Sequence, residues 1–208
     1  MKFRLALLGT IGLLAAAPAF AQPKPNSIVG TVPTKVATYS TAFVALAPAA
    51  SATDFLTLTG SSTMVVRVKQ VECFAIGTAN ASATVNAVVR STADSGGTAV
   101  TPSSSAGGQA VPHDSADNAA SATVAAYTAN PTTGTLVGIV RSGKLTNTTA
   151  ASSTIESTPP LQWIFGQNFQ KEVVLRGTGQ VFALNGAGAS FTAGAALNCS
   201  IEWTETPN

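Results

Sequence analysis

An alternation of apolar and polar side chains with a period of two residues recurs in short segments of this chain, and it limits the possible folds more than any other feature. In ASATVNAVVR (81–90), every second residue from Ala81 to Val89 is apolar, and the residues between them are mostly polar. DFLTLTG (54–60) and ALNCSIEWT (196–204) repeat the pattern. This period is typical of β-strands with one buried face.

About ten such segments follow one another, separated by glycine, proline, asparagine and serine, and no long segment has the period of a helix. The pair Asn185-Gly186 is a strong signal for a tight turn. We therefore predict an all-β fold, an antiparallel β-sandwich or jelly roll, formed by one domain over residues 54–208. Many inward positions are alanine, so the bulk of the core is expected from four aromatic residues: Trp163, Phe165, Phe182 and Trp203.

The segment MVVRVKQVECFAI (64–76) changes phase halfway along. Val66 and Val68 continue one apolar face, whereas Val71 and Cys73 begin the other. One extra residue in a strand produces such a switch, so a β-bulge is predicted near Lys69-Gln70.

The N-terminus has the form of a bacterial secretory signal peptide over residues 1–21. A short basic segment precedes the apolar run LALLGTIGLLAAAPAF, and Ala19-Phe20-Ala21 has the small-x-small pattern of a cleavage site. A retained membrane anchor is the alternative, although the run is short for a bilayer span. The mature chain then begins near Gln22 and is secreted or periplasmic. Residues 22–53 are expected to form an N-terminal arm or linker that adds an edge strand.

Removal of residues 1–21 leaves nine Lys and Arg residues against nine Asp and Glu residues, because Lys2 and Arg4 are lost from totals of 11 and 9. A formally neutral chain lacks the basic surface that nucleic acids or anionic membranes require. We therefore expect no nucleic-acid partner, and the mature chain offers no apolar run long enough to span a membrane.

The two cysteines, Cys73 and Cys199, are expected to form a disulfide in an oxidising compartment. Both fall on the apolar face of a predicted strand, so the two strands must lie side by side or face each other across the sandwich. The closed loop of more than a hundred residues corresponds to about 4–5 kcal/mol in the chain-entropy model. Two separately buried thiols are the alternative.

The segment VPHDSADN (111–118) contains the only histidine of the chain, His113, followed by Asp114 and Asp117. A catalytic zinc site needs three protein ligands and a catalytic triad needs a positioned serine, and neither pattern accompanies this histidine. We interpret the segment as a loop in which Asp114 caps a helical turn. Calcium bound through Asp114, Asp117 and backbone carbonyls is a minor alternative.

Two further pairs of residues have chemical potential. Glu72 and Glu202 each neighbour a cysteine, so a disulfide would bring these carboxylates together as in a glycoside hydrolase, although both fall on outward faces. Trp163 and Tyr127 could form a platform on which a sugar stacks, although alternating aromatic residues of strands are more often core.

Four segments resemble a family of uncharacterised proteins encoded in tailed-phage and prophage regions: VPHDSADNAASATVAAYTANPTTGTLVGIVRSGKL (111–145), PPLQWIFG (159–166), KEVVLRGTGQVFALN (171–185) and LNCSIEWTE (197–205). The resemblance covers residues 54–205 and implies a β-rich structural or accessory virion protein that self-associates. It supplies no catalytic residues. The chain departs from this family in its signal peptide, since phage particles assemble in the cytoplasm.

These observations predict an exported, non-enzymatic protein that uses no cofactor. It is expected to act through its surface, by forming a homo-oligomer or by binding a cell-surface or virion partner. A carbohydrate-binding module is the first alternative, and a secreted glycoside hydrolase using Glu72 and Glu202 is the second.

Overall fold

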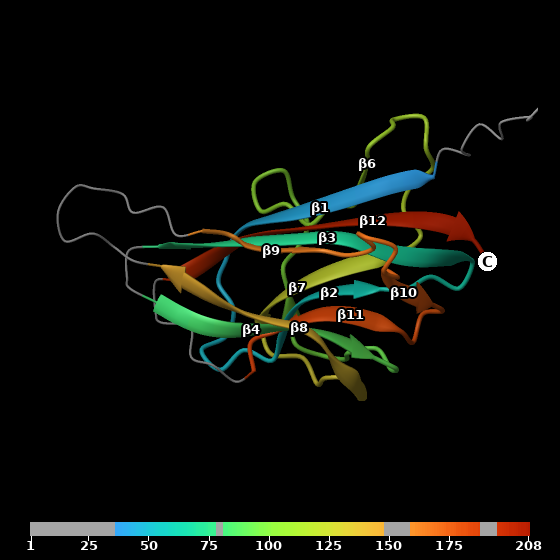
Figure 1. Ribbon diagram of the computed structural model, residues 1–208. Coiled ribbons are helices and arrows are strands. Elements are labelled where there is room, and N and C mark those ends of the chain that lie inside the picture. The colour runs from blue at the N-terminus through green and yellow to red at the C-terminus, as the bar shows by residue number, and fades with distance from the viewer. Residues whose placement is uncertain (1–35, 78–80, 148–158, 188–194) are drawn as a thin grey trace, which may run out of the picture. The chain divides into compact units, whose positions relative to one another are not determined.

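The computed structural model describes residues 36–77, 81–147, 159–187 and 195–208, and within these ranges the chain consists of strands, turns and loops. The predicted signal peptide lies outside the described residues. Among the residues described, none belongs to a helix long and apolar enough to cross a membrane. The strands form two antiparallel sheets packed face to face, so the predicted all-β sandwich is confirmed (Figure 1).

The first sheet has the strand order β10-β3-β12-β1-β6, with β9 paired to β3 beside β10. Its longest strands run next to one another through the middle of the sheet. The members are β1 (Ala37–Leu46), β3 (Met64–Gly77), β6 (Val111–Pro112), β9 (Leu161–Ile164), β10 (Val173–Arg176) and β12 (Ala195–Pro207).

The second sheet has the order β5-β7-β2-β11-β4-β8 and lies beneath the first in Figure 1. Its members are β2 (Asp54–Thr59), β4 (Ala81–Arg90), β5 (Thr98–Ala99), β7 (Thr123–Ala129), β8 (Leu136–Asn147) and β11 (Val181–Asn185).

The pairing of the strands is that of a jelly roll. The first strand pairs with the last (β1 with β12), and the pairs β2–β11, β3–β10 and β4–β8 follow inward along the chain. A ribbon of four such antiparallel pairs, wound so that successive pairs alternate between sheets, buries one face of each sheet against the other. The terminal strand β12 lies between β1 and β3, so it is a direct neighbour of the early strand that carries Cys73.

A long insertion, residues 91–135, interrupts this scheme between β4 and β8 and contributes β5, β6 and β7. β6 continues the first sheet beyond β1, and β7 and β5 continue the second sheet beyond β2. The insertion therefore covers the same lateral side of both sheets, where unpaired backbone groups would otherwise be exposed.

The predicted boundary of the N-terminal arm needs correction. Residues 22–53 were expected to contribute no more than an edge strand, but β1 lies inside the first sheet between β12 and β6. From Ala37 onward the chain is part of the sandwich, paired with β12 as far as Leu46. The segment TAFVALA (41–47) has the character of a short strand, but its brief alternation does not indicate that the strand begins at Ala37 and that its inward residues Tyr39 and Phe43 are fully buried.

The bulge predicted near Lys69-Gln70 is present. Gln70 is opposite Glu202, but the next β12 residue, Trp203, is opposite Val68, so Lys69 is the extra residue. The bulge allows Val66, Val68, Val71 and Cys73 all to face the interior.

Cys73 and Cys199 form the expected disulfide, and the strands that carry them lie side by side. The two residues are directly opposite each other on β3 and β12, with 4.2 Å between their Cα atoms. Both are buried, and 126 positions separate them in the sequence. Because both strands belong to one sheet, the bond joins an early and a terminal strand within the first sheet.

The core between the sheets combines a few large side chains with many small ones. Trp203 is fully buried and its ring stacks on Tyr39, with 5.9 Å between centroids. Phe165 meets Phe182 edge to face at 5.8 Å. Trp163 is half-buried against this core. The predicted bulk is thus in place, and alanines such as Ala83, Ala87 and Ala126 fill the closer-packed parts.

Candidate functional site

The predicted loop around His113 is an exposed turn. Its shape is set locally: the Ala116 backbone N–H donates to Asp114 Oδ1 (3.1 Å), and that of Asp117 donates to the Asp114 carbonyl (2.9 Å). The His113 backbone N–H donates to the Thr38 carbonyl (2.8 Å) and holds the turn beside β1. Asp114 thus caps a turn, as expected, but no helix follows. In the described part of the chain, no three metal-ligating side chains of His, Cys, Asp or Glu are grouped.

The structure does not bring Trp163 and Tyr127 together. Trp163 is opposite Val71 on the inner face of the first sheet and packs on the core. Tyr127 belongs to β7 of the second sheet, and its neighbour Ala126 is the residue that faces the core. Side chains alternate along a strand, so Tyr127 points to the opposite, outer face of its sheet. A shared stacking platform is therefore wrong.

Glu72 and Glu202 both lie on the outer face of the first sheet. Glu72 is opposite Ser200, and Glu202 is opposite Gln70, so the two carboxylates are diagonal neighbours. They are partly exposed on a sheet surface. The disulfide brings them close, as expected. A glycoside hydrolase places the scissile bond between its two carboxylates, however, and of these two only Glu72 lines the groove described below.

A buried ionic cluster that the sequence did not indicate lies at the outer face of the second sheet. The Arg90 guanidinium binds the Asp54 carboxylate through two nitrogens: Nη2 donates to Oδ1 (2.7 Å), and Nε donates to Oδ2. The third nitrogen, Nη1, donates to the Gly134 carbonyl (2.8 Å). Asn185 Nδ2 donates to the same carboxylate. Asp94 Oδ1 is 3.7 Å from Arg90 Nε and accepts the Gly134 backbone N–H (2.8 Å).

One cation thus faces two buried carboxylates. Burial raises the pKa of Asp94 above its ordinary 3.8, and the negative charge of Asp54 adds to this, against the opposing effects of the Gly134 hydrogen bond and of Arg90. The hydrogen bond to Asp54 raises the pKa of Arg90. Because the cluster joins β2, β4 and the insertion and its side chains are almost wholly buried, it fastens the insertion to the sandwich.

A third buried carboxylate, that of Glu205, fastens the middle of the insertion. Glu205 accepts the backbone N–H groups of Ser121 (2.9 Å) and Ala122 (3.0 Å), and the indole Nε1–H of Trp203 (2.9 Å). Tyr39 adds a hydrogen bond from its hydroxyl to the Asn118 carbonyl (2.9 Å). These hydrogen bonds hold the insertion against β1 and β12.

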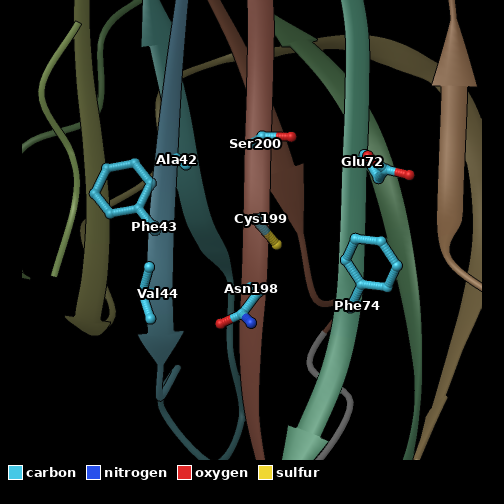
Figure 2. A pocket seen from close by; sticks show the side chains of 8 residues that line it. All are labelled: Ala42, Phe43, Val44, Glu72, Phe74, Asn198, Cys199 and Ser200. Atoms are coloured by element: carbon cyan, nitrogen blue, oxygen red, sulfur yellow. The ribbon is translucent and has the colours of Figure 1, made fainter. Parts of the chain in front are cut away.

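A shallow groove lies on the outer face of the first sheet, above β12 (Figure 2). It has a volume of about 210 Å³. The neighbouring strands form its walls and the small residues of β12 form its floor. We call it the outer groove; its outward-facing residues are Ala42, Val44, Glu72, Phe74, Asn198 and Ser200.

The shape of the outer groove follows from the sequence of the three strands. Ser200 on β12 is much shorter than Phe74 on β3, and Phe74 and Val44 on β1 are about half exposed. Asn198 Oδ1 accepts the backbone N–H of Ala45 (2.9 Å), at the irregularity where β1 shifts register against β12. The result is an apolar hollow with one carboxylate, Glu72, on its rim.

Two further apolar features are exposed. The first half of β8 presents Leu136, Val137 and Ile139, each more than half exposed. Within the described residues this half of β8 has only β4 as a paired strand, so the edge of the second sheet is open there. Exposed apolar edge strands are sites at which another chain can add a strand.

The second feature is Phe169, in the loop between β9 and β10, whose side chain is fully exposed. Its φ is 64° and that of Asn168 is 52°, a left-handed conformation that is rare for an aromatic residue. The base of the loop is fixed by the Phe165 backbone N–H, which donates to the Lys69 carbonyl (2.8 Å), and by the ion pair of Lys69 with Glu172 (2.7 Å). A rigid base therefore carries a protruding aromatic tip.

Comparisons of the chain with protein-family models, curated proteins and solved structures give no match.

Proposed function

We propose that this chain is an exported, non-enzymatic structural protein that acts by self-association through its surface. The observation that carries the proposal is the exposure of large apolar side chains at three separate places: the outer groove, the β8 edge and the Phe169 tip. Open apolar edge strands and protruding aromatic residues are typical of sites at which another chain binds. The burial of these side chains against another chain removes apolar area from water, which favours association.

The organisation of the rest of the domain supports an architectural role. The insertion is held in place by two sets of buried charged groups, the Asp54–Arg90–Asp94 cluster and the Glu205 carboxylate. In this proposal these groups have a structural role. The disulfide ties the terminal strand to β3 in the centre of the first sheet. A domain stiffened in this way presents its surface in a fixed geometry, which lowers the conformational cost of association.

The proposal includes export. The disulfide is compatible with an extracellular or periplasmic location, since such bonds persist in oxidising compartments. The residues predicted to direct export, 1–21, lie outside the described part of the chain. We propose that cleavage after Ala21 releases a mature chain beginning at Gln22.

A virion-related ancestry would suit such a subunit. Jelly rolls form the subunits of many viral shells, although they also occur in lectins and cupins, so the fold by itself assigns no activity. Support comes from the resemblance of residues 54–205 to proteins of phage regions, together with the exposed apolar surface.

Carbohydrate binding is a second candidate, now at a different place from the one first expected. In the outer groove, Phe74 is an exposed aromatic ring with Glu72, Asn198 and Ser200 beside it. An aromatic face with polar groups around it suits a sugar ring. A glycoside hydrolase has less support, because Glu202 does not line the groove.

The experiment that tests self-association is light scattering on the purified, exported chain over a hundredfold range of concentration. The proposal expects the mean mass to rise above that of one chain as concentration increases. A glycan array on the same sample tests the second candidate. A mass that stays at one chain throughout would refute self-association, and a specific glycan signal would favour the carbohydrate alternative.

A further inference from the structure

We propose that the Phe169 tip of one copy inserts into the outer groove of a second copy, with Lys171 of the tip paired to Glu72 of the groove. This inference rests on the proposed self-association and identifies the contact through which it occurs.

The first argument is the match between tip and groove in size and polarity. A cavity of about 150 Å³ lined by apolar side chains is known to hold a benzene ring. The outer groove, at about 210 Å³ and walled by Val44 and Phe74, has room for one phenyl ring. Offset or edge-to-face contact with the Phe74 ring would add an aromatic interaction to the burial of apolar area.

The second argument is the match in charge and spacing. Lys171 follows Phe169 by two positions and is exposed. Glu72 precedes Phe74 by two positions on the same face of β3. The two-residue step from Glu72 to Phe74 along extended β3 spans about 6–7 Å, a separation that the long side chain of Lys171 can cover from the turn at Phe169. A phenyl ring seated beside Phe74 therefore allows the Lys171 ammonium to approach the Glu72 carboxylate.

The third argument is that the tip is held ready for contact. Gly166, Asn168 and Phe169 have positive φ values of 78°, 52° and 64°, and the Gln170 backbone N–H donates to the Gln167 carbonyl (3.0 Å). Phe169 thus protrudes from a defined turn. Aromatic residues presented on preorganised loops are typical anchors of protein–protein interfaces.

The proposed contact joins two copies, because the residues that line the groove come from β1, β3 and β12 and Phe169 of the same copy is not among them. Each copy offers one tip and one groove. The same contact can therefore repeat from copy to copy, as assembly of a structural protein requires.

The first test is photo-crosslinking of the exported full chain with p-benzoylphenylalanine at position 169. Irradiation should yield a covalent dimer in which peptides containing Val44, Phe74 or Asn198 are joined to the loop. The same probe at Val111, which is also exposed and lies outside the groove, serves as the control and should not mark these peptides. Failure to crosslink, or crosslinks that map to the β8 edge, would overturn the inference.

The second test is a charge exchange with a readout of the dissociation constant. Phe169→Ala should weaken association by about tenfold or more, the effect of removing a central aromatic anchor. Lys171→Glu and Glu72→Lys should each weaken it a few-fold, and the two substitutions together should recover most of that loss. These positions are surface sites, so folding should persist in every variant, which circular dichroism verifies.

The outcomes separate the two proposals. Association that persists undiminished in Phe169→Ala would overturn the tip-in-groove contact and leave self-association standing. A chain that remains monomeric at every concentration would overturn both. A glycan that occupies the groove without affecting association would also overturn the contact.

Discussion

Removal of the Arg90 side chain should destabilise the fold strongly. Arg90→Met keeps an unbranched apolar stem but removes the guanidinium, so the fully buried Asp54 carboxylate loses its bidentate partner. Loss of one partner from a buried ion pair typically costs about 3–5 kcal/mol. The bond from Arg90 Nη1 to the Gly134 carbonyl (2.8 Å) is lost as well, at about 1 kcal/mol.

The assay is urea denaturation of the oxidised chain at pH 7, followed by tryptophan fluorescence, with thermal unfolding alongside. For a domain of this size a loss of about 4 kcal/mol corresponds to about 10 °C in Tm. Addition of Asp54→Asn to the variant is the matched control: it removes the orphaned charge while keeping an acceptor for Asn185, and should restore part of the stability. A loss below about 1 kcal/mol in Arg90→Met, or no recovery in the double variant, would refute this account of the cluster.

Three further predictions concern the same framework. Replacement of both Cys73 and Cys199 by alanine should lower the free energy of unfolding by about 4–5 kcal/mol in the chain-entropy model. Denaturation of the variant beside the oxidised and the reduced wild type checks this, and a variant as stable as the oxidised wild type would contradict it. The folded-state pKa of Asp94 is raised, so its contribution to stability is complete below its ordinary pKa of 3.8 and is lost as the pH rises through the raised value. Asp94→Asn should abolish this loss and be at least as stable as the wild type at pH 8. Denaturation as a function of pH measures this, and a variant with unchanged pH dependence would count against the prediction. Glu205→Gln places an amide where three N–H groups converge, and it should lower the free energy of unfolding by about 2 kcal/mol. Denaturation should show this loss, and limited proteolysis near Ser121 should become faster. An unaltered cleavage rate there would argue against the role of Glu205.

The fold could be predicted from the sequence because each strand carries its own signal. Alternation placed most strands, and the phase change in β3 located the bulge at Lys69 within one residue. The inward position of both cysteines predicted that their strands would be close, but left open whether they share a sheet. Pairing is a property of the assembled sheet, and only the structure decides it.

The buried ionic cluster could not be predicted, because nothing local distinguishes it. Asp54 begins a strand and Arg90 ends another, positions where charged residues are ordinarily solvated. Their burial depends on the insertion folding back so that Gly134 and Asp94 close over them. A contact between segments tens of residues apart leaves no trace in the periodicity of either segment.

The candidate contact surfaces were missed for a related reason. Phe169 lies in a loop without alternation, and the sequence does not indicate whether a loop aromatic folds inward. The outer groove arises from differences in side-chain length between β1, β12 and β3, and these strands become neighbours only in the sheet. Glu72 was singled out by its position beside a cysteine, and it does border the groove, but with Phe74 rather than with a catalytic partner.

Hydroxyl-radical footprinting of the exported chain at low and high concentration tests the central claim most directly, since it reports the exposure of individual side chains. The account predicts that Phe169 and Phe74 both lose reactivity as concentration rises, while exposed Val111 stays equally reactive. If Phe169 and Phe74 react equally at every concentration, their side chains remain in water and the proposed self-association through this contact is wrong.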